Sequence, residues 1–351
     1  MSPVALHRNE MPKDIPAELK RQIAAQISNV AFNMYPEPFA HSLVVELAQW
    51  YGCRPEQLMV APGSSAFIRL LFTHYALKPQ GYIVIARPSF QYYEEYCQAF
   101  GIAYSTWELD EHLEFDENQL GKLPEQSMVM FASPNNPTGQ SIPLPMLKRL
   151  LRRCPQTLFV VDEAYAEFAG NSALKLINNF SNLIVLRTLS KALSAAGIRC
   201  GALIANERTV SELTRLQTPF QVSSLTSQIV KQMLAYDRDV SWVKQQIQKV
   251  IKERQLIYET CQALLPPTWY LFQSEANFLL LKCPDHATAK RLVQTCNDHD
   301  IAIADLSNLP RLAGCVRITV GLREHNHQFI SALTKCLDPT LPDVAFPLPS
   351  N

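Results

Sequence analysis

Short apolar runs, separated by longer segments with helical spacing, dominate the middle of the chain. The runs are YIVIA (82–86), MVMFA (128–132), LFVVD (158–162), LIVLR (183–187) and ALIA (202–205). Runs of this length without polar alternation are typical of strands buried on both faces. Segments such as SSAFIRLLFTHYAL (64–77) and LPMLKRLLRRC (144–154) lie between them and have helical spacing. This alternation predicts an α/β fold with a mainly parallel sheet and crossover helices.

The pattern changes after about residue 220. A long amphipathic helix is predicted over 227–265, followed by a strand at 277–281, a helix, and a strand at 315–320. These elements predict a second, smaller α+β unit. We expect an N-terminal arm (1–30) that packs with the small domain, a large domain (31–235) and a small C-terminal domain (236–351). A chain of 351 residues that is 47% apolar can bury a core of this size.

Charge and cysteine usage exclude several classes of protein. Lys plus Arg equal Asp plus Glu at 32 each, so no basic field predicts binding to nucleic acid or to a membrane surface. The chain has no leader-like or membrane-spanning apolar segment, and its histidines show no metal-ligand spacing. The nine scattered cysteines indicate reduced thiols. We therefore expect a cytoplasmic protein with a small-molecule ligand and no metal.

Polar segments follow three of the predicted strands. They are SPNNPTG (133–139), DEAY (162–165) and TLSKALSAAGIR (188–199), and the last contains Lys191. In open α/β sheets, ligands bind beyond the carboxyl ends of the strands. The three segments therefore predict one ligand site.

The residue types in these segments suit an aldehyde cofactor bound to the lysine. A lysine that forms a Schiff base with a pyridine aldehyde needs an acid at the ring nitrogen, a position that Asp162 suits. The phenolic oxygen of the ring needs hydrogen-bond partners, which Asn136 and Tyr165 offer. A cofactor phosphate needs hydroxyl and guanidinium donors, which Ser190 and Arg199 offer.

Motifs along almost the whole chain carry a family resemblance. They are NEMP (9–12), YPEP (35–38), PGSS (62–65), PSFQYY (88–93), SPNNPTG, DEAY, RTLSKALSAAGIRCG (187–201) and VRITVGLRE (316–324). In order and spacing these segments resemble the fold-type I pyridoxal-phosphate aminotransferases, and most of all the histidinol-phosphate aminotransferase family. The resemblance implies an enzyme with pyridoxal 5'-phosphate as cofactor, a small-molecule amino donor and a 2-oxo acid acceptor.

The resemblance also implies roles for the residues of the site. Lys191 would bind the cofactor as a Schiff base and shuttle the proton, and Asp162 would hold the pyridinium nitrogen. Asn136 and Tyr165 would bind the ring oxygen. Arg317 would hold the α-carboxylate of the substrate, because a bidentate guanidinium suits a planar carboxylate, and Asn136 would also bind the substrate.

Further positions match the family at the edge of the cofactor. Gly63, Ser64 and Ser65 precede a predicted helix, so their N–H groups would bind the phosphate at the helix N-terminus. Tyr93 matches the aromatic residue that stacks on the cofactor ring, with Tyr92 as a register-shifted alternative.

Tyr35, in YPEP, resembles the tyrosine that reaches the cofactor phosphate of the opposite subunit. The resemblance therefore implies a homodimer with shared active sites.

The chain departs from the family in one place that bears on substrate choice. The resemblance places an arginine that grips the substrate's phosphate directly before an aspartate upstream of Arg317. Here Ala304 precedes Asp305. An alanine offers no charge, so we expect a substrate without a phosphate, unless Arg311 compensates.

Two other classes of function stay open. The same cofactor residues serve lyases, cyclases and decarboxylases such as the threonine-phosphate decarboxylases, because the outcome depends on which substrate bond stands perpendicular to the ring. The second class is a non-catalytic regulatory protein that binds the cofactor. The intact Lys191 argues against it.

Overall fold

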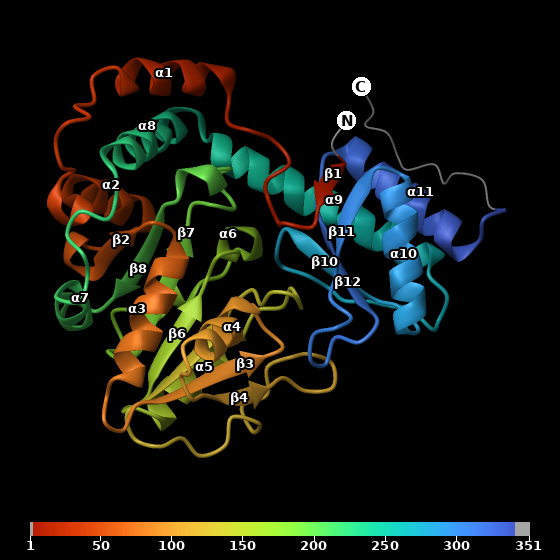
Figure 1. Ribbon diagram of the computed structural model, residues 1–351, viewed down its shortest axis with the longest axis horizontal. Helices are drawn as coiled ribbons and strands as arrows, with labels where there is room; N and C mark the ends of the chain where they lie inside the picture. The colour runs from red at the N-terminus through yellow and green to blue at the C-terminus, as the bar shows by residue number, and fades with distance from the viewer. Residues whose placement is uncertain (1–2, 341–351) are drawn as a thin grey trace.

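The computed structural model describes residues 3–340 and consists of two sheets with helices packed on their faces (Figure 1). The strands of the larger sheet are β2 (Leu58–Ala61), β3 (Tyr82–Arg87), β4 (Ser105–Glu108), β5 (Ser127–Ala132), β6 (Leu158–Asp162), β7 (Leu183–Thr188) and β8 (Gly201–Ala205). The strands of the smaller sheet are β1 (Val4–Leu6), β9 (Tyr270–Leu271), β10 (Phe278–Lys282), β11 (Ile301–Asp305) and β12 (Cys315–Thr319). The helices are α1 (Ala17–Ile27), α2 (His41–Tyr51), α3 (Ser64–Ala76), α4 (Tyr92–Ala99), α5 (Leu144–Arg153), α6 (Ala166–Ala169), α7 (Glu207–Thr214), α8 (Ser224–Val240), α9 (Trp242–Leu264), α10 (His286–Asp298) and α11 (Arg323–Leu337).

The larger sheet has the strand order β2-β8-β7-β6-β5-β3-β4. Neighbours from β7 to β4 are parallel, whereas β8 runs antiparallel to both β7 and β2. The smaller sheet has the order β1-β11-β12-β10-β9 and is antiparallel except for the β1–β11 pair. The predicted α/β class with a mainly parallel sheet is confirmed. Each of the five apolar runs forms a strand of the larger sheet.

Both faces of the larger sheet are covered. On β5, Val129 and Phe131 point into one buried cluster and Met128 and Met130 into the other. The second cluster also contains the buried face of α3, including Phe72. A strand packed on both faces needs apolar side chains at every position, which explains the unbroken apolar runs.

The single helix predicted over 227–265 is wrong, because the structure divides this segment into α8 and α9. Ser241 lies between the two helices with a left-handed backbone (φ 51°). The buried Asp237 side chain accepts a hydrogen bond from the Val243 N–H at 2.6 Å, which satisfies a donor in the first turn of α9. This local hydrogen bond stabilises the junction between α8 and α9.

The N-terminal segment spans both sheets. β1 pairs with β11 at the edge of the smaller sheet, whereas α1 packs on α8 beside the larger one (Figure 1). The Gln232 amide, on α8, donates to Gln22 on α1 at 2.9 Å. The division of the chain at residues 30 and 235 stays a prediction, and residues 341–351 lie outside the described part. No helix within residues 3–340 has the length and apolar character needed to cross a bilayer.

Candidate active site

A cavity of about 300 Å³ lies beyond the carboxyl ends of β5, β6 and β7, facing the smaller sheet. Most of the predicted site residues line it: Ser64, Ser65, Tyr93, Asn136, Asp162, Tyr165, Ser190, Lys191, Arg199 and Arg317. Parallel strands bring their carboxyl ends to one edge of a sheet, so the polar segments that follow them meet there. The predicted single ligand site is therefore formed by the fold.

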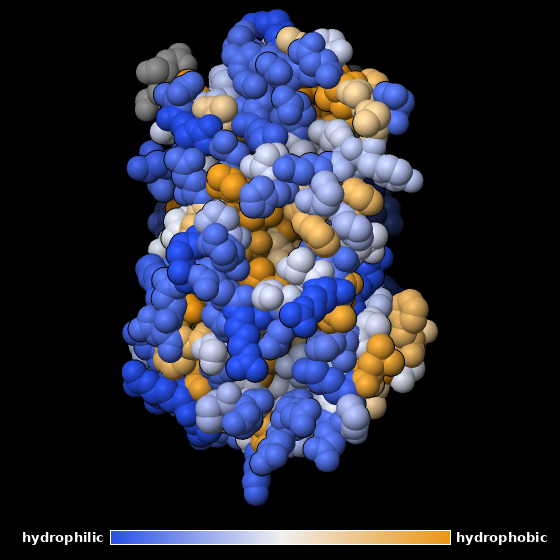
Figure 2. Space-filling view, turned by 90° about the vertical axis from the view of Figure 1, so that its left-hand side faces the viewer, coloured by the Kyte–Doolittle hydropathy of each residue, from blue (hydrophilic) through white to orange (hydrophobic). Residues whose placement is uncertain are grey.

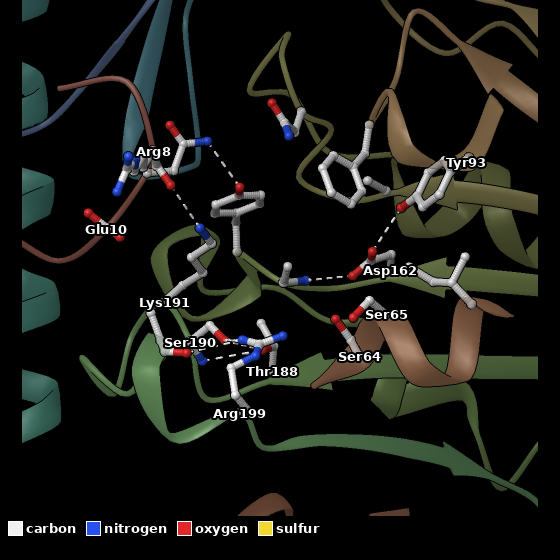
Figure 3. A pocket seen from close by; sticks show the side chains of 18 of the residues that line it. Arg8, Glu10, Ser64, Ser65, Tyr93, Asp162, Thr188, Ser190, Lys191 and Arg199 are labelled. Carbon is white, nitrogen blue, oxygen red and sulfur yellow. Dashed lines mark hydrogen bonds between the residues drawn. The ribbon is translucent and has the colours of Figure 1, made fainter. Parts of the chain in front are cut away.

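Asp162 ends β6 at the floor of this cavity and is buried. One carboxylate oxygen accepts a hydrogen bond from the Tyr93 hydroxyl at 2.8 Å, and the other accepts one from the Ala164 N–H at 3.2 Å (Figure 3). Burial raises the pKa of Asp162 to about 6, although these bonds and nearby Lys191 favour the charged form. A buried acid of this kind is stabilised when a cation, such as a protonated ring nitrogen, binds beside it.

Lys191 follows β7 and reaches across the cavity. Its Nζ donates a hydrogen bond to the backbone carbonyl of Arg8 at 3.1 Å and lies 5.7 Å from the centre of the Tyr165 ring (Figure 3). Within residues 3–340 no carboxylate forms an ion pair with it. The amine is therefore held by a neutral carbonyl.

Arg317, on β12, brings a guanidinium into the cavity from the smaller sheet. It donates to the Asn136 side-chain oxygen and, at 2.7 Å, to the His7 carbonyl. Its buried Nε lacks a hydrogen-bond partner within the described chain. Both of its partners are neutral, so the charge of Arg317 is not balanced by a neighbouring carboxylate.

The donors predicted for a phosphate gather at the start of α3. Ser64 and Ser65 form its first turn, where backbone N–H groups lack helical partners. Arg199 donates to the Ser190 hydroxyl at 3.2 Å, and Ser190 lies 3.0 Å from the Thr188 hydroxyl. Backbone donors, hydroxyls and a guanidinium form a donor set that suits a phosphate.

Two glycines make this cradle possible. Gly63 has a left-handed backbone (φ 81°), and a Cβ atom there would lie 2.5 Å from the Arg199 guanidinium. A Cβ atom on Gly201 would lie 2.3 Å from the Ser64 backbone nitrogen. Any side chain at these positions would therefore occupy the cradle or displace its walls.

The three aromatic residues considered for the site differ in their position relative to the cavity. Tyr93 lines the cavity with its ring fully buried and turns its hydroxyl to Asp162, whereas Tyr92 is not among the described lining residues. Tyr35 lies outside the cavity, 83% exposed, with its ring stacked on Phe220 at 5.1 Å. Stacking by Tyr93 and a role for Tyr35 stay predictions.

Sequence reasoning missed several residues of the cavity. Arg8, Asn9, Glu10, Phe90 and Thr188 line it as well. The NEMP and RTLSK motifs contain Asn9, Glu10 and Thr188, so they held a signal for three of these residues. The NEMP motif does not say where the N-terminal segment lies in the fold, which became visible only through the pairing of β1 with β11.

A buried ionic cluster lies directly behind the site. Arg187 contacts Glu163 at 3.0 Å and Glu167 at 2.9 Å, and it also donates to the Ser172 hydroxyl at 2.9 Å. Burial raises the pKa of both carboxyl groups, while the arginine opposes this effect. Because Glu163 adjoins Asp162 in the chain, the cluster ties the end of β6 to the end of β7.

Comparisons with known proteins agree with this geometry. The family model of the class I and II aminotransferases matches residues 2–333. The histidinol-phosphate aminotransferase of Pyrococcus furiosus is 34% identical over 336 residues, which cover 95% of this chain and 92% of that protein. The resemblance inferred from the motifs is therefore confirmed.

Solved structures share the fold. That of histidinol-phosphate aminotransferase from Sinorhizobium meliloti in complex with pyridoxal-5'-phosphate has a TM-score of 0.83 and 22% identity, covering 97% of this chain and 92% of that one. L-threonine-O-3-phosphate decarboxylase from Porphyromonas gingivalis has a TM-score of 0.78 and 24% identity, covering 95% and 99%. Both the acid at the cavity floor and the phosphate cradle fit the cofactor. The chain belongs to the aminotransferase class I and II family, as a fold-type I enzyme that depends on pyridoxal 5'-phosphate.

Proposed function

We propose that this aminotransferase moves an amino group between an amino compound that carries no distal phosphate and a 2-oxo acid. The observation that carries the proposal is the register of β11 and β12, in which Ala304 lies directly opposite Arg317. Directly opposed residues of an antiparallel pair project from the same face of the sheet. The position where the family has its phosphate-binding arginine therefore adjoins Arg317, and a methyl group occupies it.

Arg311 supports the proposal because its guanidinium is engaged elsewhere. It donates to the carbonyls of Leu109 and, at 2.7 Å, Asp110, and it lies 3.3 Å from the Glu108 carboxylate. A charge-assisted contact is worth about 1.5 to 3 kcal/mol. With Ala304 in place of the family's arginine, a phosphorylated substrate would therefore bind roughly tenfold to over a hundredfold more weakly.

We assign roles to the site residues that their positions support. When bound, the cofactor supplies a ring that takes up electrons from the substrate carbon. Lys191 would bind the cofactor covalently and move the proton, and Asp162 would keep the ring nitrogen protonated. Tyr165 and Asn136 would bind the ring oxygen. Arg317 orients the substrate by its carboxylate.

The phosphate of the cofactor would be held at the start of α3. Ser64 and Ser65, which follow Gly63, line the cavity together with Ser190 and Arg199. Tyr93 lines the same cavity and would contact the ring of the cofactor.

We also propose a homodimer in which Tyr35 completes the site of the partner subunit. The segment between α1 and α2 exposes Phe32 (75%), Met34 (66%) and Tyr35 (83%), and Phe220 lies against it. Figure 2 looks onto this side of the molecule, where apolar residues lie among hydrophilic ones. Several exposed apolar side chains in one short segment support an interaction surface.

The nine cysteines are all free, which is the state expected in a reducing compartment. We propose a cytoplasmic enzyme, and the free cysteines support this.

The test is a panel of amino donors that includes histidinol, histidinol phosphate, phosphothreonine and the common amino acids, each with 2-oxoglutarate as acceptor. We expect amino transfer from a donor without phosphate, no carbon dioxide release, and no turnover by Lys191→Ala. Carbon dioxide release without consumption of the 2-oxo acid would assign the enzyme to the decarboxylases instead.

A further inference from the structure

We propose that Asn9 is a positioning residue for Tyr165: its side-chain amide directs the hydroxyl hydrogen of Tyr165 into the cavity, toward the cofactor's ring oxygen. The inference rests on the proposed role of Tyr165. Asn9 belongs to the N-terminal segment and would act through Tyr165, not by contact with the cofactor.

Asn9 is fixed by its backbone. It is 2% exposed and has a left-handed φ of 53°. Its N–H donates to the Thr319 hydroxyl oxygen at 3.0 Å, and its carbonyl accepts from the Asn277 amide at 3.1 Å. Thr319 and Asn277 thus fix the backbone from which the Asn9 side chain extends.

The hydrogen-bond network also sets which end of the amide faces Tyr165. The Thr319 oxygen already accepts the Asn9 N–H, so its own hydrogen is free to be donated to the Asn9 side-chain oxygen at 3.1 Å. The amide nitrogen then faces Tyr165 and donates to its hydroxyl oxygen at 3.0 Å. In the reverse orientation both the backbone N–H and the side-chain amide nitrogen of Asn9 would face the Thr319 oxygen. The hydroxyl hydrogen of Thr319 would then lose its acceptor on Asn9.

This bond leaves the Tyr165 hydroxyl with one hydrogen to donate elsewhere. The Tyr165 ring is held edge to face against Phe278 at 5.1 Å, so mainly the O–H bond is free to turn. Because Asn9 donates to the oxygen, the hydrogen points away from Asn9. A phenol that accepts a hydrogen bond is also a stronger donor. Asn9 therefore selects the tyrosine's role as a donor to the ring oxygen.

The direct test is the pH midpoint of the visible absorbance of bound pyridoxal phosphate. Losing a hydrogen bond to the charged ring oxygen should raise this midpoint by about one to two pH units. We expect Tyr165→Phe to show the full rise and Asn9→Ala a smaller one. The double variant should match Tyr165→Phe, because the two residues act through one hydroxyl. Asn9→Asp should approach Tyr165→Phe, because a carboxylate takes the hydroxyl hydrogen.

Asn326→Ala is the matched control for a structural effect. Asn326 is 1% exposed and hydrogen-bonds at both ends of its amide, to Gly321 and Glu253, away from the cavity. It should lower the melting temperature without moving the midpoint. If Asn9→Ala does not fold, Thr319→Val, which frees the amide to turn, should raise the midpoint.

The outcomes separate the claims. A midpoint that Asn9→Ala and Asn9→Asp leave unchanged, while Tyr165→Phe raises it, overturns the inference alone. A midpoint unchanged by Tyr165→Phe overturns the proposed role of Tyr165 and the inference with it. Wild-type protein that gains no visible absorbance from pyridoxal phosphate overturns the account of the site as a whole.

Discussion

The Tyr93 hydroxyl donates a hydrogen bond of 2.8 Å to the Asp162 carboxylate, and both side chains are buried at the floor of the cavity. Burial nevertheless dominates, and it raises the pKa of Asp162 from 3.8 to about 6. In the cofactor-free protein, Asp162 therefore takes up a proton on folding between these two pH values.

This uptake predicts how the stability of the cofactor-free enzyme depends on pH. Because the folded state binds more protons at Asp162, its contribution to the free energy of unfolding decreases as the pH rises from 3.8 to about 6. The slope is at most about 1.4 kcal/mol per pH unit. Asp162→Asn removes it, so the variant should gain stability relative to wild type as the pH rises. Urea midpoints between about pH 4 and pH 7 test this, and a constant difference between the two proteins would contradict it.

The ionic cluster behind the site predicts a large loss on removing its cation. Arg187→Met leaves the buried Glu163 and Glu167 without their partner, which should cost about 3 to 5 kcal/mol of unfolding free energy. Adding Glu163→Gln and Glu167→Gln should restore much of it. Arg149→Ala, which breaks an exposed pair with Glu117, should cost below about 1 kcal/mol. Urea unfolding measures the free energy of unfolding of Arg187→Met, of the triple variant and of Arg149→Ala. Equal losses of this free energy in Arg187→Met and Arg149→Ala would refute the role of burial.

The close approach of Gly201 to Ser64 predicts a local effect on the cofactor cradle. Gly201→Ala places a methyl group against backbone atoms that cannot turn aside. We expect at least about tenfold weaker binding of pyridoxal phosphate and a stability loss of about 1 to 3 kcal/mol. Gly197→Ala is the matched control, because no atom lies within 4 Å of its added Cβ. Fluorescence titration with the cofactor compares the two, and equal affinities would show that the cradle tolerates the methyl group.

The apolar segment before α2 predicts the state of assembly. Sedimentation should show a dimer, and Phe32→Asp with Tyr35→Ser should produce monomers with weaker cofactor binding. Tyr270→Ser removes a 56% exposed aromatic residue of the smaller sheet and should leave the dimer intact. A fully active wild-type monomer would remove Tyr35 from the site.

The sequence predicted those parts of the fold in which local pattern and burial coincide. Strands β3 and β5 to β8 are apolar at nearly every position because helices cover both faces of the sheet. The short strands at the sheet edges, such as β4 (STWE) and β9 (YL), lack that pattern and depend on their neighbours for pairing. The break at Ser241 was also invisible, because it depends on a side-chain bond from Asp237 across a pattern that stays amphipathic.

The candidate site was predictable where it follows strand ends. Asp162 and Lys191 end or follow buried strands, so their chemistry and their place could be inferred together. Asn9 could not be found in this way, because it is placed by the pairing of β1 with β11, more than 290 residues away in the chain. Nor did the sequence reveal that Tyr93 turns its hydroxyl to Asp162, a choice of side-chain orientation that depends on the packing of the cavity.

The central claim, that this aminotransferase acts on donors without a distal phosphate, is tested most directly by the kcat/KM ratio of histidinol phosphate to histidinol in wild type and in Ala304→Arg. The new arginine would stand opposite Arg317 on the face of the sheet that meets the cavity. We predict a wild-type ratio of one or less and a rise of about tenfold or more in the variant, from one added charge-assisted contact. A wild-type enzyme that strongly prefers histidinol phosphate, with a ratio that Ala304→Arg leaves unchanged, would contradict the account.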